Sequence, residues 1–237
     1  MTEYNRLIAY GDSFVHGDGL RTRDQTRPNY WERHSPDSWP HLLGNKLGIP
    51  TINRGIPGGS NFGSAHVMLR DCTELNINPT DLVYVLLSHP GRIPIPVNNT
   101  EWIYESSVHF SSAKSAKFLQ DIGLLVTPRQ IAEARTLDAV NLIRMITSHT
   151  GCTLRIFWGW FDLHQVEFPK LYDIPVDINQ RSEGKIHGLT SELDLASPTH
   201  KTKCGHWNER GHQRVAEHIF EYEQVRKAND SVAYEKL

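Results

Sequence analysis

Mostly apolar runs alternate with segments of helical periodicity along much of the chain. Runs at 7–10, 82–87 and 153–158 have the length and the bounding turn residues of buried strands, and a shorter strand is predicted at 51–53. Between them, hydrophobic residues recur at helical spacing, most regularly over 128–148. The apolar positions of this longest predicted helix are Ile131, Leu137, Val140, Ile143 and Ile146. Shorter helices are predicted at 38–47, at 64–73 and near the C-terminus. The alternation predicts an α/β fold, a three-layer α/β/α sandwich around a mainly parallel, doubly wound sheet.

The composition is that of an ordinary globular chain, with 237 residues, a formal net charge of −2 and 38% hydrophobic residues. This length suits one α/β domain better than two. A net charge of −2 provides no basic surface to attract nucleic acid, and the sequence contains no run of about 18 apolar residues long enough to span a membrane. Neither a nucleic acid nor a membrane is therefore expected as a partner. The first six residues lack the features of a secretory signal, which predicts a cytoplasmic protein. Because one of the three widely spaced cysteines must stay unpaired, we expect reduced thiols.

The first predicted strand stops abruptly at Gly11-Asp12-Ser13. A serine hydroxyl at the carboxyl end of a central strand lies where open α/β sheets bind their ligands, which makes Ser13 a candidate nucleophile. The alternative is an ordinary turn, since all three residue types are common turn formers.

A histidine near the other end of the chain is a candidate base. His206 precedes a helix whose apolar positions include Val215 and Ile219, so it is predicted on a loop where it could reach Ser13. A neutral imidazole that accepts the serine proton is the usual way to activate this weak nucleophile. The histidines and the cysteine of this region match no tetrahedral ligand spacing, so neither a metal nor another cofactor is expected.

These two segments together resemble the first and last conserved blocks of the SGNH (GDSL-type) esterases and lipases. The resemblance implies a flavodoxin-like sandwich, an acyl-serine mechanism and an oxyanion site formed by backbone N–H groups. It places Ser13 and Gly58 as oxyanion donors, Gly58 lying in the glycine-rich turn that follows the strand at 51–53. A glycine suits this role because a side chain would obstruct the approach of its N–H to the substrate.

The chain departs from the family pattern at two positions. The asparagine that would donate the remaining oxyanion hydrogen bond is replaced by Pro90, which has neither a side-chain donor nor an N–H. The acid expected three residues before His206 is Lys203, which cannot orient an imidazole as a carboxylate does. The substitute oxyanion donors that the sequence offers are Ser88, His89, Arg92 and Asn61.

The missing acid leaves three interpretations open. A Ser-His dyad could operate with a backbone carbonyl orienting the ring, a displaced carboxylate could take over, or the chain could be an inactive relative. Asp194 and Asp162 are the candidate displaced acids. Because Ser13, Gly58 and His206 are all present, we favour a dyad or a displaced acid.

Two insertions, at about 18–37 and 88–126, interrupt the predicted scaffold near the carboxyl ends of strands. We expect them to wall the active site and to set specificity, although both could instead be surface loops. The candidate substrate contacts are Trp31, Arg92 and Trp207.

The sequence therefore predicts a serine esterase that cleaves a carboxylic ester, with a small molecule or an O-acetylated carbohydrate as the candidate substrate. The alternative is a non-catalytic carbohydrate-binding or structural module on the same scaffold. A fold resemblance alone does not separate the two, because function resides in the site.

Overall fold

A four-stranded parallel sheet forms the centre of the computed structural model, which describes residues 4–20, 34–96, 102–106, 129–159, 162–203 and 205–234. The strands are β1 (Arg6–Gly11), β2 (Thr51–Gly55), β3 (Asp81–Leu87) and β6 (Thr153–Trp158), in the order β2-β1-β3-β6. The chain reverses its direction of winding between β1 and β3, and such a switch point is where open α/β sheets bind ligands.

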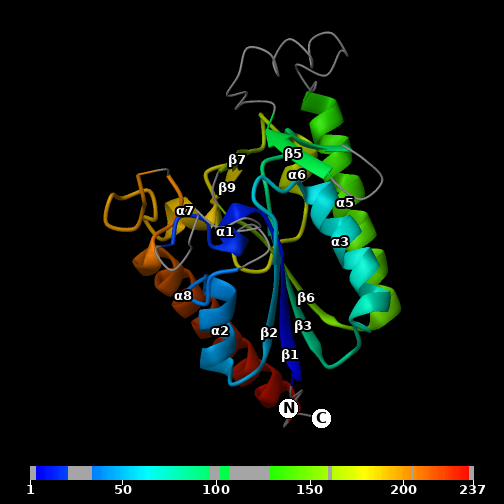
Figure 1. The fold of residues 1–237 in the computed structure, drawn as a ribbon, viewed down its shortest axis with the longest axis vertical. Helices are drawn as coiled ribbons and strands as arrows, with labels where there is room; N and C mark the ends of the chain where they lie inside the picture. Colours follow the sequence, from blue (N-terminus) through cyan, green and yellow to red (C-terminus); the bar gives the residue numbers. More distant parts are fainter. Residues whose placement is uncertain are drawn as a thin grey trace.

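Helices cover both faces of the sheet (Figure 1). Helices α2 (Trp39–Leu47) and α8 (Glu209–Tyr234) lie on one face, and α3 (Asn61–Glu74) and α5 (Arg129–Thr150) lie on the other. The predicted three-layer sandwich with a mainly parallel sheet is confirmed. Helix α3 begins three residues earlier than predicted because Ser60 caps it, its Oγ accepting a hydrogen bond from Gly63 N at 3.0 Å.

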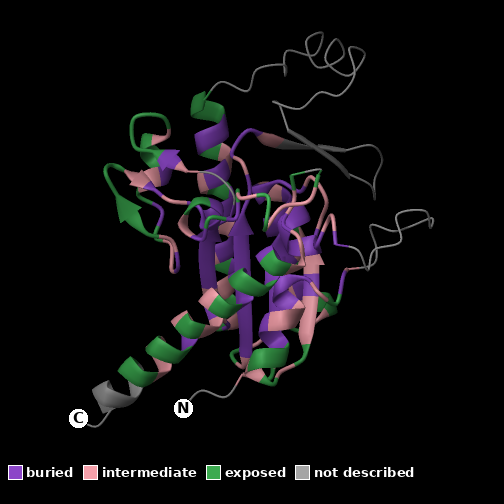
Figure 2. Ribbon diagram, turned by 90° about the vertical axis from the view of Figure 1, so that its left-hand side faces the viewer, coloured by how far each residue is buried: buried purple, intermediate pink, exposed green. Residues whose placement is uncertain are grey.

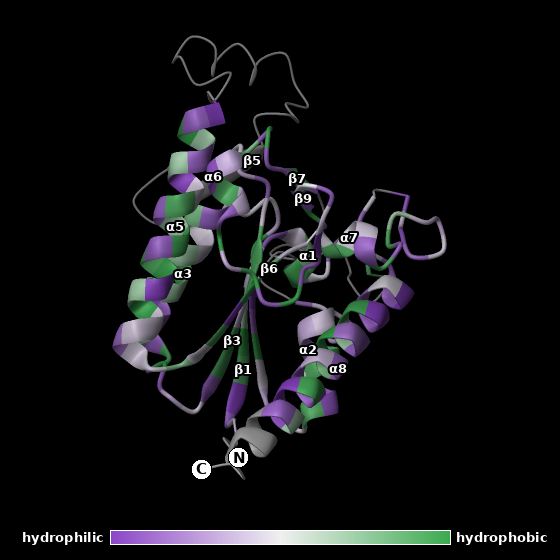
Figure 3. Ribbon diagram, turned by 180° about the vertical axis from the view of Figure 1, so that it is seen from behind, coloured by the Kyte–Doolittle hydropathy of each residue, from purple (hydrophilic) through white to green (hydrophobic). Residues whose placement is uncertain are grey.

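The core consists of two apolar layers, one on each face of the sheet. One layer joins Met68 of α3 and Ile143 of α5 to the sheet, and the other joins Trp39 of α2 and Val215 of α8. Strands β1, β3 and β6 are buried along most of their length, whereas the edge strand β2 is only partly buried (Figure 2), and hydrophobic residues are concentrated in the central strands (Figure 3). Burial on both faces explains why β1 and β3 are near-continuous apolar runs rather than alternating ones.

Helix α8 is also tied to the sheet by a buried ion pair. Arg155 Nε donates to Glu223 Oε1 at 2.7 Å, and Tyr84 donates its hydroxyl hydrogen to the same oxygen at 2.8 Å. The pKa of Tyr84 is raised well above its ordinary value, mainly by burial and to a smaller extent by the negative charge of Glu223. The group therefore stays protonated and keeps donating, which fixes the helix that follows His206.

Smaller elements gather around the carboxyl ends of the strands. They are α1 (Ser13–His16), the antiparallel pair β4 (Arg92–Pro96) and β5 (Trp102–Ser106), β7 (Leu163–His164), α6 (Pro169–Tyr172), β8 (Arg181–Ser182), β9 (Lys185–Ile186) and α7 (Leu189–Glu192). Most of the predicted insertion at 18–37, including Trp31, lies outside the described residues, as do 97–101 and 107–126 of the second. Within the described part of the chain, no helix has both the length and the apolar character needed to cross a bilayer.

Candidate active site

The turn after β1 presents Ser13 at the start of α1. Asp12 caps this helix, with its Oδ1 accepting a hydrogen bond from Phe14 N at 3.0 Å. Gly11 has a φ of +152°, and a Cβ at this position would lie 2.6 Å from Val15 Cγ2 and 2.9 Å from the carbonyl oxygen of Leu86. Only glycine fits this backbone, so the short turn that carries Ser13 requires the residue that the sequence has.

His206 lies on a tight loop immediately before α8. The backbone N–H of Thr202 donates to the carbonyl oxygen of His206 at 2.8 Å, which closes the loop. Asn208 then caps α8, because its Oδ1 accepts from Gly211 N at 3.1 Å. The position of His206 is thus set by hydrogen bonds on both sides of it.

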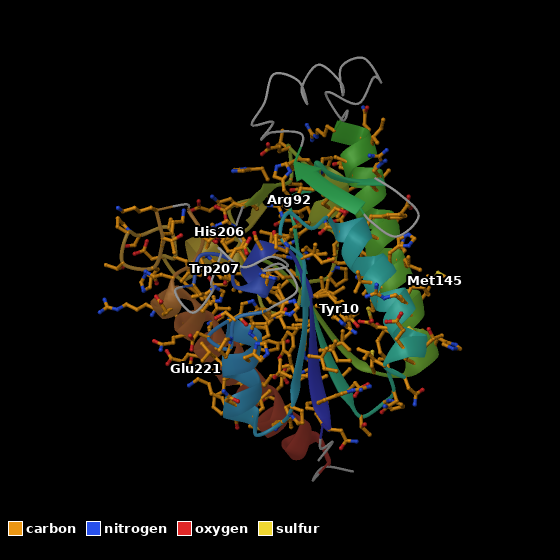
Figure 4. The ribbon with its side chains drawn as sticks, in the orientation of Figure 1. Tyr10, Arg92, Met145, His206, Trp207 and Glu221 are labelled. Carbon is orange, nitrogen blue, oxygen red and sulfur yellow. The ribbon has the colours of Figure 1, made fainter. Side chains whose placement is uncertain are left out.

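The structure brings the two predicted catalytic residues together although 193 positions separate them. His206 Nε2 lies 3.0 Å from Ser13 Oγ, within hydrogen-bond distance. The ring of Phe14 lies 5.3 Å from the His206 ring, between centroids, and supports it from the side. Figure 4 shows His206 at the end of the sheet where α1 begins. This geometry allows an imidazole to accept the serine proton.

Two backbone N–H groups beside this pair remain available as donors. Gly58 has a φ of +71° in a turn over residues 56–59, which Gly59 N closes by donating to the carbonyl oxygen of Ile56 at 2.8 Å. Pro57 and Gly58 are the residue types that a type II turn favours at its centre. Within the described part of the chain, neither Ser13 N–H nor Gly58 N–H donates a hydrogen bond. Such a pair of donors is what an oxyanion site requires.

Asn61 does not extend this pair of donors, because its carboxamide is already used. Asn61 Nδ2 donates to the Ser88 carbonyl at 3.0 Å and to Thr136 Oγ1 at 3.4 Å, while Asn61 Oδ1 accepts from Ser88 N at 2.6 Å. These contacts clamp the end of β3, and they correct the prediction that Asn61 serves as an oxyanion donor. The Ser88 side-chain oxygen is enclosed and has no hydrogen-bond partner among the described residues, so it does not face a substrate either.

Arg92 is partly buried and makes contacts within the protein. Its Nη1 donates to Asp12 Oδ2 at 2.8 Å and to the carbonyl oxygen of Gly59 at 3.1 Å. The Arg92 side chain is 10% exposed, and that of Asp12 is fully buried. Arg92 thus joins the turn that carries Ser13 to the Gly58 turn, and a contact between Arg92 and the substrate stays a prediction.

The two candidate acids make their contacts elsewhere. Asp162 accepts hydrogen bonds from Gly188 N at 2.9 Å and from Ser191 Oγ at 2.5 Å, and it pairs with Lys185 at 3.4 Å. Burial raises the pKa of the Asp162 carboxyl, but these three partners together lower it below its ordinary value. Asp194 is an exposed turn residue with a φ of +52°. Among the described contacts, neither carboxylate is joined to His206.

Trp207 is a core residue, which corrects the prediction that it contacts the substrate. Its side chain has no exposed surface, and its ring lies 4.6 Å from that of Phe14, between centroids. The indole N–H donates to Thr190 Oγ1 at 3.3 Å. Trp207 therefore anchors the His206 loop from below (Figure 4).

Comparison with known proteins identifies the fold. No protein-family model matches the chain, and no curated protein matches it in sequence. Among solved structures, an acetyl xylan esterase (Est2A) from Butyrivibrio proteoclasticus is similar with a TM-score of 0.54 and 11% identity, over 96% of this chain and 66% of that one. The lipase Lip_vut3 from a goat rumen metagenome is similar with a TM-score of 0.51 and 10% identity, over 92% and 96%.

The psychrotrophic esterase EstA from Pseudoalteromonas sp. is similar with a TM-score of 0.50 and 13% identity, over 95% of this chain and 99% of that one. The structural neighbours are thus esterases and lipases. The chain is an α/β protein with the fold of the SGNH (GDSL-type) lipolytic esterases. Identities of 10–13% make it a divergent example of that fold.

Proposed function

We propose that this chain is a serine esterase that hydrolyses carboxylic esters, with Ser13 as the nucleophile and His206 as the base. The observation that carries the proposal is the 3.0 Å contact between Ser13 Oγ and His206 Nε2, with two available N–H donors beside it. A nucleophile within hydrogen-bond reach of its base, next to an oxyanion site, is the arrangement that acyl transfer requires.

The proposed reaction proceeds through an acyl-serine. Ser13 Oγ attacks the ester carbonyl carbon while its proton passes to His206 Nε2. The negative charge that develops on the carbonyl oxygen is stabilised by Ser13 N–H and Gly58 N–H. When the carbon–oxygen bond breaks, the leaving alcohol takes the proton from His206. His206 then removes a proton from water, whose oxygen attacks the acyl carbon. The bond between this carbon and Ser13 Oγ breaks, Ser13 Oγ takes the proton back from His206, and the acid is released.

The proposed mechanism uses neither Asp162 nor Asp194. Both carboxylates have other roles, Asp162 in organising residues 185–191 and Asp194 in an exposed turn. We expect Asp162→Asn and Asp194→Asn each to leave kcat/KM within about threefold of the original chain, far from the ~10⁴-fold loss that follows removal of a triad acid. A larger loss in either variant would identify that residue as the displaced acid.

The substrate class proposed is an ester of a short acyl group, with O-acetylated carbohydrate as the candidate natural substrate. An acetyl xylan esterase is among the similar folds, which supports testing acetylated glycans first. No cofactor takes part in the proposed reaction.

The test is hydrolysis of p-nitrophenyl acetate and of acetylated xylan, together with labelling by a fluorophosphonate. We expect Ser13→Ala and His206→Ala to lower kcat/KM by at least about 10³-fold, and Ser13→Ala to abolish labelling. The matched controls are Ser148→Ala on the exposed surface of α5 and His200→Ala, which removes another histidine near the same loop. A chain that neither hydrolyses these esters nor labels at Ser13 would overturn the proposal in favour of the non-catalytic binding module.

A further inference from the structure

The turn that carries Gly58 N–H is anchored to the nucleophile turn at its first residue. The backbone N–H of Ile56 donates to the carbonyl oxygen of Gly11 at 2.9 Å. This contact joins the two turns through their backbones, two residues before Gly58 and two before Ser13. The turn itself is closed by Gly59 N, which donates to the carbonyl oxygen of Ile56 at 2.8 Å, and this hydrogen bond does not tie the Gly59 end to the turn that carries Ser13.

The far end of the turn is anchored through a side chain. Arg92 Nη1 donates to the carbonyl oxygen of Gly59, the residue after Gly58, and to Oδ2 of Asp12, the residue before Ser13. Asp12 is itself fixed, because its other oxygen caps α1 through Phe14 N. One guanidinium nitrogen thus links the two residues that adjoin the proposed oxyanion donors.

An arginine is suited to this link by its chemistry. Its guanidinium is planar, always charged and pre-organised, so it loses little freedom when it bridges two acceptors. The Asp12 side chain is fully buried, and in such an environment charge-assisted hydrogen bonds are strong. The base of the Arg92 side chain is also held, since Arg92 N donates to the carbonyl oxygen of His89 at 3.1 Å.

We propose that Arg92 is a positioning residue that fixes Gly58 N–H relative to Ser13 N–H, so that both donors point at the same oxyanion. The role of this geometry in turnover rests on the proposed esterase function, whereas the fixing of the turn does not. Arg92 touches no reacting atom in this scheme and acts through Gly59 and Asp12.

The kinetic test separates positioning from stability by removing both charges of the pair. Arg92→Met alone leaves a buried, unpaired carboxylate and is expected to destabilise the chain. The double variant Arg92→Met/Asp12→Asn removes that charge and keeps a side-chain oxygen to cap α1. We expect its thermal midpoint to exceed that of Arg92→Met, while kcat stays about 10- to 100-fold below the original value and KM changes less than about threefold.

Two further variants sharpen the result. Arg92→Lys keeps the charge near Asp12, but its ammonium lies on a flexible stem and is not pre-organised to bridge two acceptors, so its kcat should lie between those of the original chain and the double variant. The matched control Arg70→Met removes an exposed arginine that pairs with Glu74 at 3.3 Å on α3, and it should leave kcat unchanged. Recovery of the original kcat by the double variant would overturn the proposal.

A measurement on the free protein tests the fixing of the turn without relying on turnover. We expect the ¹⁵N order parameter of Gly58 to fall from about 0.85, typical of a rigid backbone, toward 0.6 or below in Arg92→Met/Asp12→Asn. The order parameter of Gly211, a glycine in the first turn of α8, should not change. An unchanged Gly58 value would overturn the proposal even if the chain hydrolyses esters, and a decrease would support it even if the chain hydrolyses none.

Discussion

Acid should destabilise this fold in part through one buried histidine at the start of α8. His212 lies in the first turn of α8 with no exposed surface, and its Nδ1 accepts a hydrogen bond from Trp39 N at 3.1 Å, which ties α8 to the start of α2. Protonation of Nδ1 would break this contact and would place a charge in the core. The pKa of His212 is lowered from 6.5 to about 3, mainly by burial and to a smaller extent by repulsion from a charged His206.

The sign and size of the effect follow from proton linkage. Below pH 6.5 the unfolded chain binds a proton at His212, while the folded chain does not bind one until the pH approaches 3. The free energy of unfolding is therefore unaffected by His212 above pH 6.5 and falls as the pH decreases through that window. Over the 2.5 units from pH 6.5 to pH 4, at 1.36 kcal/mol per unit, the loss is about 3 kcal/mol.

The assay is urea unfolding at pH 7, 5.5 and 4, for the original chain and for His212→Asn. The asparagine oxygen can accept from Trp39 N but cannot be protonated in this range, so the variant should lose about 3 kcal/mol less between pH 7 and pH 4. His34, whose pKa burial lowers to about 4, is present in both proteins, and its contribution cancels in the comparison. Equal losses in the two proteins would refute the reasoning.

Three more outcomes are expected for core and clamp residues. Asn61→Leu removes the partner of both backbone groups of Ser88 and should lower the free energy of unfolding in urea by about 2–4 kcal/mol, and a loss under 0.5 kcal/mol would contradict the clamp. Trp207→Ala should cost about 3–5 kcal/mol in the same assay, whereas an exposed substrate contact would alter KM with little change in stability. Arg155→Met should cost about 3–5 kcal/mol, and adding Glu223→Gln should restore most of it, because an unpaired buried charge costs more than a missing pair.

The sheet and the Ser13–His206 pair could be predicted from the sequence because both depend on local patterns combined with one topological rule. Buried parallel strands are apolar throughout, so their runs stand out, and ligands bind at the carboxyl ends of such strands. The β4–β5 hairpin was not predicted, since Pro94 and Pro96 disfavour a strand. Both prolines lie on a two-stranded ribbon, where a missing N–H need not interrupt a ladder.

The roles of Trp207 and Arg92 could not be predicted, because neither depends on its neighbours in sequence. An aromatic residue beside the proposed catalytic histidine suits a substrate contact as well as a core position, and only its packing on Phe14, from the other end of the chain, decides between them. Arg92 follows a strand and is charged, which is typical of a surface residue. Its buried partner is 80 positions away, and no local signal indicates this pairing.

The two departures from the family pattern bear differently on the proposed chemistry. Lys203, which stands where the family has its acid, is exposed to solvent. His206 is held instead by the backbone hydrogen bonds of its loop and by the buried Trp207 next to it. Pro90 is buried in a segment that the Asn61 clamp fixes at Ser88, and it offers no donor. In the proposed mechanism a third donor is missing, so transition-state stabilisation depends more heavily on how well the two remaining N–H groups are aligned. A rigid link between their turns, such as that made by Arg92, is therefore more important in this chain than in a site with three donors.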